Sequence, residues 1–362
     1  MTNAAPIAPP FKNSPTAYLN VLRIFACLMV LTVHSGEFFY ITAEGGVAPV
    51  HHVWVNHYGS LMRACVPLFV MISGYLLLPI KEAPSVFYKK RFTRLLIPFL
   101  VWSCMYAIVP YLLGTDTAQK MWTNLATIPV NLNWSAGHLW FVYMFIGVYL
   151  FIPVISPWVQ TASKNFKLFF LAIWVFTLFL PYIRTIYPDV LGEVFWNKFS
   201  SVYYFSGYIG YLVLGYYIKD YVRLSKSATV IIGLLLIIAG YLITHEVFAH
   251  QWPTAKSLPE LELSWAFPTI NVAMMATGMF LLFSLISLKS ANLEMRIAKF
   301  SGLTYGMYLA HILVLNQLYA PINNWLHEPV MVIPVLAVCT FIVTYIGIKL
   351  LSYLPGSKYI VG

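Results

Sequence analysis

Long apolar runs separated by short polar loops dominate this chain. Leu, Ile, Val, Phe and Tyr recur in blocks of about twenty residues, the length needed to cross a hydrocarbon core as a helix. The alternation over roughly ten residues that is typical of a membrane barrel is absent. The pattern predicts ten transmembrane helices, at 17–36, 59–79, 95–113, 138–157, 166–184, 200–219, 227–245, 268–288, 301–320 and 331–352.

The composition supports a membrane protein. Hydrophobic residues make up 60% of the chain, charged residues only 9%, and the mean hydropathy is +0.75. A soluble domain carries about 25% charged residues. We therefore predict an all-α polytopic membrane protein whose residues 17–354 form a single ten-helix domain. Residues 1–16 are expected to be a disordered cytoplasmic tail, and residues 355–362 a second cytoplasmic tail.

The positive charge is concentrated in loops on one side of the predicted bundle. With the N-terminus in the cytoplasm, sixteen of the 22 Lys and Arg residues fall in cytoplasmic segments, and nine of the twelve acidic residues fall in the opposite loops. Positively charged short loops stay in the cytoplasm. We therefore predict an even number of spans with both termini cytoplasmic. The net charge of +10 marks this topology and does not indicate a nucleic-acid partner.

The first predicted span carries a polar stripe in the segment NVLRIFACLMVLTVHSGE. Arg23 and His34 are eleven positions apart, which is three helical turns plus roughly 20°, so they share one face. Asn20 and Glu37 extend that face. Ionisable groups inside a membrane are costly and usually mark a function. The alternatives are an Arg23 that snorkels to the interface and a His34 that is merely interfacial.

A basic cluster, YKKRFTRLLIP, opens the third predicted span. Arg91 and Arg94 are three residues apart on one helical face, with Lys90 beside them. Such a site suits a phosphorylated ligand. Anionic lipid head groups or topology alone explain the same cluster.

Two further histidines fall in or at the ends of spans. His138 opens the fourth span from the outer side beside Trp140, where an interfacial role is the simpler reading. In the ninth span, Thr304, Tyr308 and His311 share a face near the midplane. His311 is too deep to snorkel, although a structural hydrogen bond to a facing helix would also explain it.

Metal and nucleotide chemistry have no motif in the chain. His51, His52 and His57 lie in one loop segment without an adjacent carboxylate, so we predict no metal there and leave their role open. The four cysteines lie in or beside apolar spans and lack ligand spacing. No Walker loop, GxGxxG, GxSxG or HExxH sequence is present.

Five motifs follow one another along the chain: Arg23 and His34 with ten residues between them, VPLFVMISGYLL at 66–77, KKRFTRLLIP at 89–98, GHLWFVY at 137–143 and SGLTYGMYLAH at 301–311. Together they resemble the membrane acyltransferase 3 family of bacterial inner-membrane proteins that acylate surface sugars. Within that family, the chain resembles the subgroup that contains the O-acetyltransferase of enterobacterial common antigen.

The resemblance implies a donor that binds from the cytoplasm. Acyl-CoA, expected to be acetyl-CoA, would have its phosphates held by Arg91 and Arg94, with Lys90 nearby. Its pantetheine arm would pass Arg23. No metal is implied.

The resemblance also implies an acceptor, a glycan or glycolipid, on the outer side of the bacterial inner membrane. His34 would act as general base on the acceptor hydroxyl. From its spacing alone, Glu37 could orient that imidazole. The expected substrate-binding residues are His138, Trp140, Tyr308 and His311.

Two other functions fit parts of the pattern. A transporter or flippase for a lipid-linked sugar would use the same polar cavity without covalent chemistry, but the inverted repeats typical of such proteins are not evident. A structural or lipid-sensing protein would explain the basic loops, although not the Arg23 and His34 face or His311. We favour the acyltransferase, with membrane lipids as its other partners.

Overall fold

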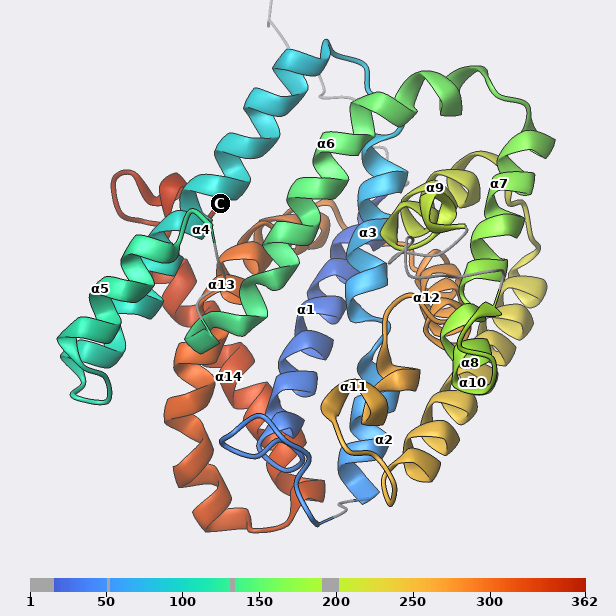
Figure 1. Ribbon diagram of the computed structural model, residues 1–362. Coiled ribbons are helices and arrows are strands. Elements are labelled where there is room, and N and C mark those ends of the chain that lie inside the picture. The colour runs from blue at the N-terminus through green and yellow to red at the C-terminus, as the bar shows by residue number, and fades with distance from the viewer. Residues whose placement is uncertain (1–15, 51–52, 131–133, 191–201) are drawn as a thin grey trace, which may run out of the picture.

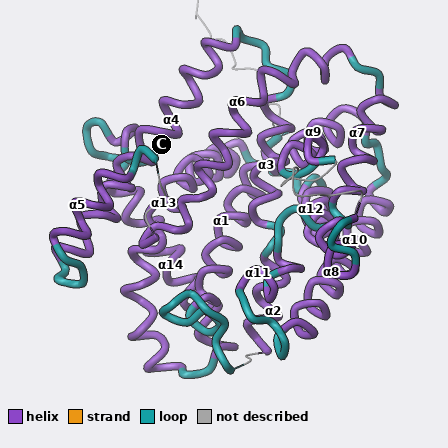
Figure 2. The backbone as a smooth tube through the Cα atoms, in the orientation of Figure 1, coloured by secondary structure: helices purple, strands orange, loops and turns teal. Residues whose placement is uncertain are grey.

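The computed structural model describes residues 16–50, 53–130, 134–190 and 202–362. Regular structure in these residues is helical, as Figure 2 shows, apart from an isolated bridge between Ile41 and Val47. His51, His52 and nearly all of the predicted N-terminal tail lie outside the described residues. The predicted all-α fold is confirmed in the part of the chain that is described.

The helices follow the order of the predicted spans (Figure 1). They are α1 (Ala17–Glu37), α2 (Val53–Met62), α3 (Cys65–Leu77), α4 (Pro84–Leu112), α5 (Ala118–Thr127), η1 (Trp134–Leu139), α6 (Trp140–Thr161), α7 (Lys164–Thr177), α8 (Leu180–Ile186), η3 (Tyr203–Phe205), α9 (Tyr208–Tyr221), α10 (Lys226–Gln251), α11 (Leu258–Leu261), η4 (Leu263–Trp265), α12 (Ile270–Phe283), α13 (Ala291–Leu326), α14 (Pro329–Leu351) and η5 (Ser357–Tyr359).

Eight helical segments in the described residues are long and apolar enough to cross a membrane, which confirms a polytopic membrane protein. The two other predicted spans coincide with α9 and α13. Helix α9 has 14 residues, and α13 has 36 residues but carries His311, Asn316 and Gln317 in its apolar stretch. The count of ten spans and the side of each terminus stay predictions.

The helices are interrupted at two places. Helix α2 ends at Met62 and α3 begins at Cys65, with Arg63 and Ala64 in a turn between them, inside the predicted span 59–79. Ala136 leaves helical geometry, with φ −127° and ψ 34°, two residues before the predicted span that begins at His138. Broken helices are tolerated at membrane depth where the freed backbone lines a cavity. Both interruptions are therefore expected to border a cavity in the bundle interior, beside Arg63 and His138.

Glycines hold α3 against α9 at backbone contact. A Cβ atom on Gly74 would lie 1.9 Å from the carbonyl oxygen of Leu212, and one on Gly215 would lie 2.1 Å from that of Met71. Small residues permit this close helix packing in membranes. The contact fixes α3, which also contributes Phe69 to the interior cavities described below.

Helix α1 lies near the centre of the bundle, packed against α3, α13 and α14 (Figure 1). The residues predicted as a C-terminal tail fold back onto the bundle. Trp102 of α4 donates a hydrogen bond to the carbonyl oxygen of Ile360 at 2.9 Å, and Val361 is buried. The C-terminal segment thus packs beside α4, where Figure 1 marks the end of the chain.

Candidate active site

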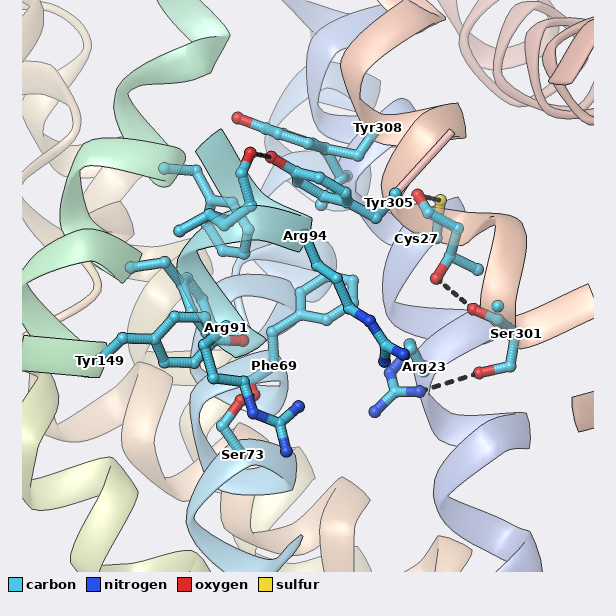
Figure 3. A pocket seen from close by; sticks show the side chains of 17 residues that line it. Arg23, Cys27, Phe69, Ser73, Arg91, Arg94, Tyr149, Ser301, Tyr305 and Tyr308 are labelled. Carbon is cyan, nitrogen blue, oxygen red and sulfur yellow. Dashed lines mark hydrogen bonds between the residues drawn. The ribbon is translucent and has the colours of Figure 1, made fainter. Parts of the chain in front are cut away.

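A cavity of about 290 Å³ lies between α1, α3, α4, α6 and α13, and we name it the arginine cavity (Figure 3). Arg23 of α1 and Arg91 and Arg94 of α4 line it. None of the seventeen described residues that line it is acidic. Three guanidinium groups therefore line one space in which no described side chain is acidic, beside Gly362, the last residue of the sequence.

The three guanidinium groups face the arginine cavity and are not paired with an acidic side chain of its described lining. Arg23 donates from Nη1 to the Ser301 hydroxyl at 3.2 Å. Figure 3 shows the Arg94 and Arg23 guanidinium groups turned toward one another, with Arg91 directed into the same space. The Arg91 Nε is buried and has no hydrogen-bond partner among the described residues. Like charges so placed repel, and an anion with several oxygens would satisfy them.

Lys90 lies apart from the arginine cavity. Its Nζ is 3.3 Å from Glu82 Oε2, its side chain is half exposed, and it does not line the cavity. Neighbouring residues on a helix point about 100° apart. The basic run at the start of α4 therefore splits into Arg91 and Arg94, which face inward, and Lys90, which pairs with Glu82.

A second cavity, of about 300 Å³, contains the predicted catalytic histidine, and we name it the histidine cavity. His34 and Glu37 of α1 line it, as do His138 and Trp140. His34 Nδ1 is 2.9 Å from Glu37 Oε2. Because this bond places the imidazole N–H at Nδ1, the other ring nitrogen, Nε2, is left as a proton acceptor.

Three imidazole rings cluster at one end of this cavity. The ring centroid of His311 is 5.1 Å from that of His34 and 4.9 Å from that of His138. Both His138 ring nitrogens and His311 Nε2 are buried without a hydrogen-bond partner in the described structure. Buried polar atoms are normally satisfied. His138 lines the histidine cavity, so its ring nitrogens are positioned to bind a ligand that enters there, whereas His311 is fully buried and does not line the cavity.

Tyr308 and the backbone fix the orientation of this cluster. The Tyr308 hydroxyl donates to the carbonyl oxygen of His138, and His311 Nδ1 lies 2.5 Å from the carbonyl oxygen of Tyr308. The structure thus brings together His34, His138, Tyr308 and His311, which the sequence placed on three separate spans. Among the described residues, no group of three or more His, Cys, Asp and Glu is placed to hold a metal ion.

A buried ion pair that the sequence analysis did not predict also borders the histidine cavity. Arg63, at the break between α2 and α3, lies 3.3 Å from Glu262 Oε1 and donates to the Tyr40 hydroxyl at 3.2 Å. Its guanidinium lies 4.3 Å from the centroid of the Trp265 ring. Arg63 and Glu262 both line the cavity.

The Tyr40 hydroxyl bridges Arg63 and Glu262, because it accepts a hydrogen bond from the first and donates one to the second. Burial, and next the charge of Glu262, raise the pKa of the Tyr40 hydroxyl well above its usual value, so it stays protonated. Arg63 was visible in the sequence as a charge inside a span, but Glu262 lies 199 residues away and had no signal.

Four residues line both cavities, and we name them the partition: Val30, Phe69, Phe141 and Tyr308. They come from α1, α3, α6 and α13. These side chains therefore lie at the boundary between the two cavities. Arg23 and His34, predicted to share a face of α1, lie on opposite sides of the partition.

The remaining described histidine of the predicted loop segment lies elsewhere. His57 Nδ1 is 2.6 Å from the Tyr241 hydroxyl, and its ring stacks on His245 at 4.5 Å. Neither residue lines the arginine or the histidine cavity.

Comparison with known proteins identifies a family for the chain. Neither the curated proteins nor the solved structures give a match. The family described as acyltransferase domain matches residues 16–349, nearly the whole chain. That match includes the helices that carry both cavities and the partition. The chain therefore belongs to this acyltransferase family and is a multi-pass membrane acyltransferase.

Proposed function

We propose that the protein transfers an acyl group, expected to be acetyl, from cytoplasmic acyl-CoA to a hydroxyl of a glycan or glycolipid at the outer face of the bacterial inner membrane. The observation that carries the proposal is the contact between two unlike cavities. One is lined by three arginines and no described acidic side chain, the other by a histidine hydrogen-bonded to a carboxylate, and four residues line both.

The arginine cavity fits the donor. Phosphate groups of CoA would contact Arg91 and Arg94 on α4, with Arg23 deeper along α1. Guanidinium groups bind phosphate through charge-assisted, often bidentate, hydrogen bonds. Arg91 and Arg94 lie near the start of α4, next to the loop after α3. The charge pattern predicts that this loop is cytoplasmic, on the side where acyl-CoA is available. The flexible pantetheine arm would then pass through the partition toward His34.

The histidine cavity fits the chemistry. With Nδ1–H donated to Glu37, His34 Nε2 takes the proton of the acceptor hydroxyl while that oxygen bonds to the thioester carbonyl carbon. The carbon–sulfur bond then breaks, and CoA leaves as a thiol with the proton that His34 held. A neutral His138 donating from one of its unpartnered nitrogens would stabilise the negative charge on the carbonyl oxygen.

The far side of the histidine cavity fits a sugar acceptor. Trp140 and Phe267 stack at 5.5 Å and line the cavity, which gives a flat apolar face. Glu37 and Glu262 offer oxygens that accept hydrogen bonds from hydroxyl groups, and Arg63 offers donors. His311 would support the cluster by ring contact with His34 and His138.

Mass spectrometry of surface glycans tests the proposal. Cells that express the wild-type protein should carry an acyl group, expected as one acetyl, that is missing from cells without the protein. Cells that express His34→Ala should match those without it. His250→Ala, which changes an exposed histidine remote from both cavities, is the matched control and should restore the modification. Identical glycans with and without the protein would reject this function.

A further inference from the structure

We infer that Phe69 and Phe141 of the partition determine which acyl chain lengths the protein accepts. The inference rests on the proposed acyl-CoA donor and concerns a property that the acyltransferase family leaves open. It follows from the position of the two rings, which line both cavities, and from the limited space that an acceptor leaves beyond them.

The partition is a contact between aromatic rings from three helices. Phe69 of α3 and Phe141 of α6 meet edge to face, with centroids 5.7 Å apart. Phe141 also packs on Tyr308 of α13 at 5.0 Å. Ring packing of this kind is dense and leaves little free volume. A thioester that reaches His34 must lie alongside these rings.

The space beyond the partition leaves little room for a longer alkyl chain. It measures about 300 Å³, and the acceptor must occupy part of the same volume. Its apolar face, Trp140 and Phe267, is the one proposed to bind the acceptor, and the rest is bordered by His34, Glu37, Arg63 and Glu262. An acyl chain longer than acetyl would cover these charged groups without offering them hydrogen bonds, which is unfavourable. With the acceptor bound, the apolar surface left beside the thioester is that of the partition, whose rings already fill the place.

Removing one ring would create the missing apolar space. A Phe→Ala change in a packed interior leaves a cavity, and a cavity lined by apolar side chains stays dry and accepts apolar ligands. Such a cavity beside the thioester would take up additional methylene groups. Phe69→Ala and Phe141→Ala should therefore extend the donor range toward longer chains.

Four matched substitutions test this inference. Phe69→Ala and Phe141→Ala change rings that line both cavities, Phe145→Ala changes a ring that lines only the arginine cavity, and Phe267→Ala one that lines only the histidine cavity. For each purified full-length variant, kcat/KM is measured with acetyl-, butyryl- and hexanoyl-CoA. The readout is the ratio of each longer chain to acetyl, so a general loss of activity does not affect it.

We expect the wild type to prefer acetyl-CoA, and the two partition variants to raise the butyryl-to-acetyl ratio at least about tenfold, the scale of one or two methylene groups in a pocket. The two other variants should keep the wild-type ratio. Equal ratios in all four variants, or a wild type that uses hexanoyl-CoA as well as acetyl-CoA, would overturn the inference while acyl transfer itself stands. A wild type that transfers no acyl group from any CoA thioester would instead reject the proposed function.

If an alanine variant fails to fold, Phe69→Leu and Phe141→Leu replace it in the same test. Leucine keeps most of the packing and opens a smaller space. The expected shift is then a detectable rise for butyryl-CoA without one for hexanoyl-CoA. Folded leucine variants with the wild-type profile would also overturn the inference.

Discussion

The arginine cavity and the histidine cavity differ most in how their charges are balanced. In the first, Arg23, Arg91 and Arg94 face one space, and none of the described lining residues is acidic. In the second, Arg63 is held by Glu262, and Glu37 is held by His34. The volumes are nearly equal, about 290 and 300 Å³, so size does not distinguish them.

This difference indicates a division of labour. A cavity with unbalanced positive charge is suited to bind an anion and gains little from a neutral ligand. A cavity whose arginine is already paired with Glu262, and whose histidine is hydrogen-bonded to Glu37, is suited to hydrogen-bond a neutral ligand and to move a proton. The proposed reaction needs both, a polyanionic donor and a neutral hydroxyl, and the partition is where they would meet.

The largest effect should come from the histidine cavity. His34→Ala removes the proposed base and should lower kcat/KM for acyl transfer about 10²- to 10⁴-fold, the usual contribution of general base catalysis. Acetyl-CoA affinity should not change, because His34 does not line the arginine cavity. Transfer assays and equilibrium binding on the same preparation separate the two quantities. Wild-type transfer by this variant would remove His34 from the chemistry.

The next effect should come from the arginine cavity. Arg91→Ala combined with Arg94→Ala should weaken acetyl-CoA binding roughly 100-fold, since hydrogen bonds to charged groups contribute about 1.5 kcal/mol each. The remaining binding should also depend less on salt. Titration calorimetry at two salt concentrations measures both changes. An unchanged affinity for acetyl-CoA would mean that the two arginines determine topology or contact lipid and do not bind the donor.

A smaller effect is expected from the ion pair beside His34. Arg63→Ala and Glu262→Gln should each raise the KM for the acceptor about tenfold, and the double variant should be no worse than the poorer single one, because paired residues are not additive. Acetyl-CoA affinity is the internal control. Effects that simply multiply would mean that Arg63 and Glu262 act independently.

The smallest effect is expected for Lys90→Ala. Lys90 pairs with Glu82 at a half-exposed site, and exposed pairs contribute about 0–1 kcal/mol. Acetyl-CoA affinity should stay within about twofold of the wild-type value. A loss as large as that of the paired arginine variant would show that the cation site extends beyond the cavity.

Hydropathy predicted most of the fold because the solvent dictates it. In hydrocarbon only helices and closed barrels satisfy their backbone, and a helix of about twenty apolar residues does so within itself, so helical spans are readable without knowing their partners. Helical periodicity also placed Arg23 and His34 on one inward face. It could not reveal the partition between them, because Phe69 and Phe141 come from other helices and look like ordinary apolar residues.

The missed parts of the site depend on long-range contacts and broken helices. Arg63 and Glu262 meet across 199 residues, and no local spacing encodes that contact. The non-helical geometry at Ala136 lies two residues before the predicted span 138–157 and was not predicted from the sequence. Lys90 was grouped with the arginines because it adjoins Arg91 and precedes Arg94 by four residues, and this spacing does not reveal its pairing with Glu82.

Side-resolved transfer in sealed inverted membrane vesicles tests the central claim most directly, because acetyl-CoA does not cross membranes and can be supplied to one face only. With labelled acetyl-CoA on the exposed cytoplasmic face, the label should appear on glycan inside the vesicle, protected from an esterase added outside. Right-side-out vesicles given the same acetyl-CoA outside should incorporate none. Label accessible to the external esterase, or transfer in right-side-out vesicles, would contradict a path that runs from the arginine cavity through the partition to His34.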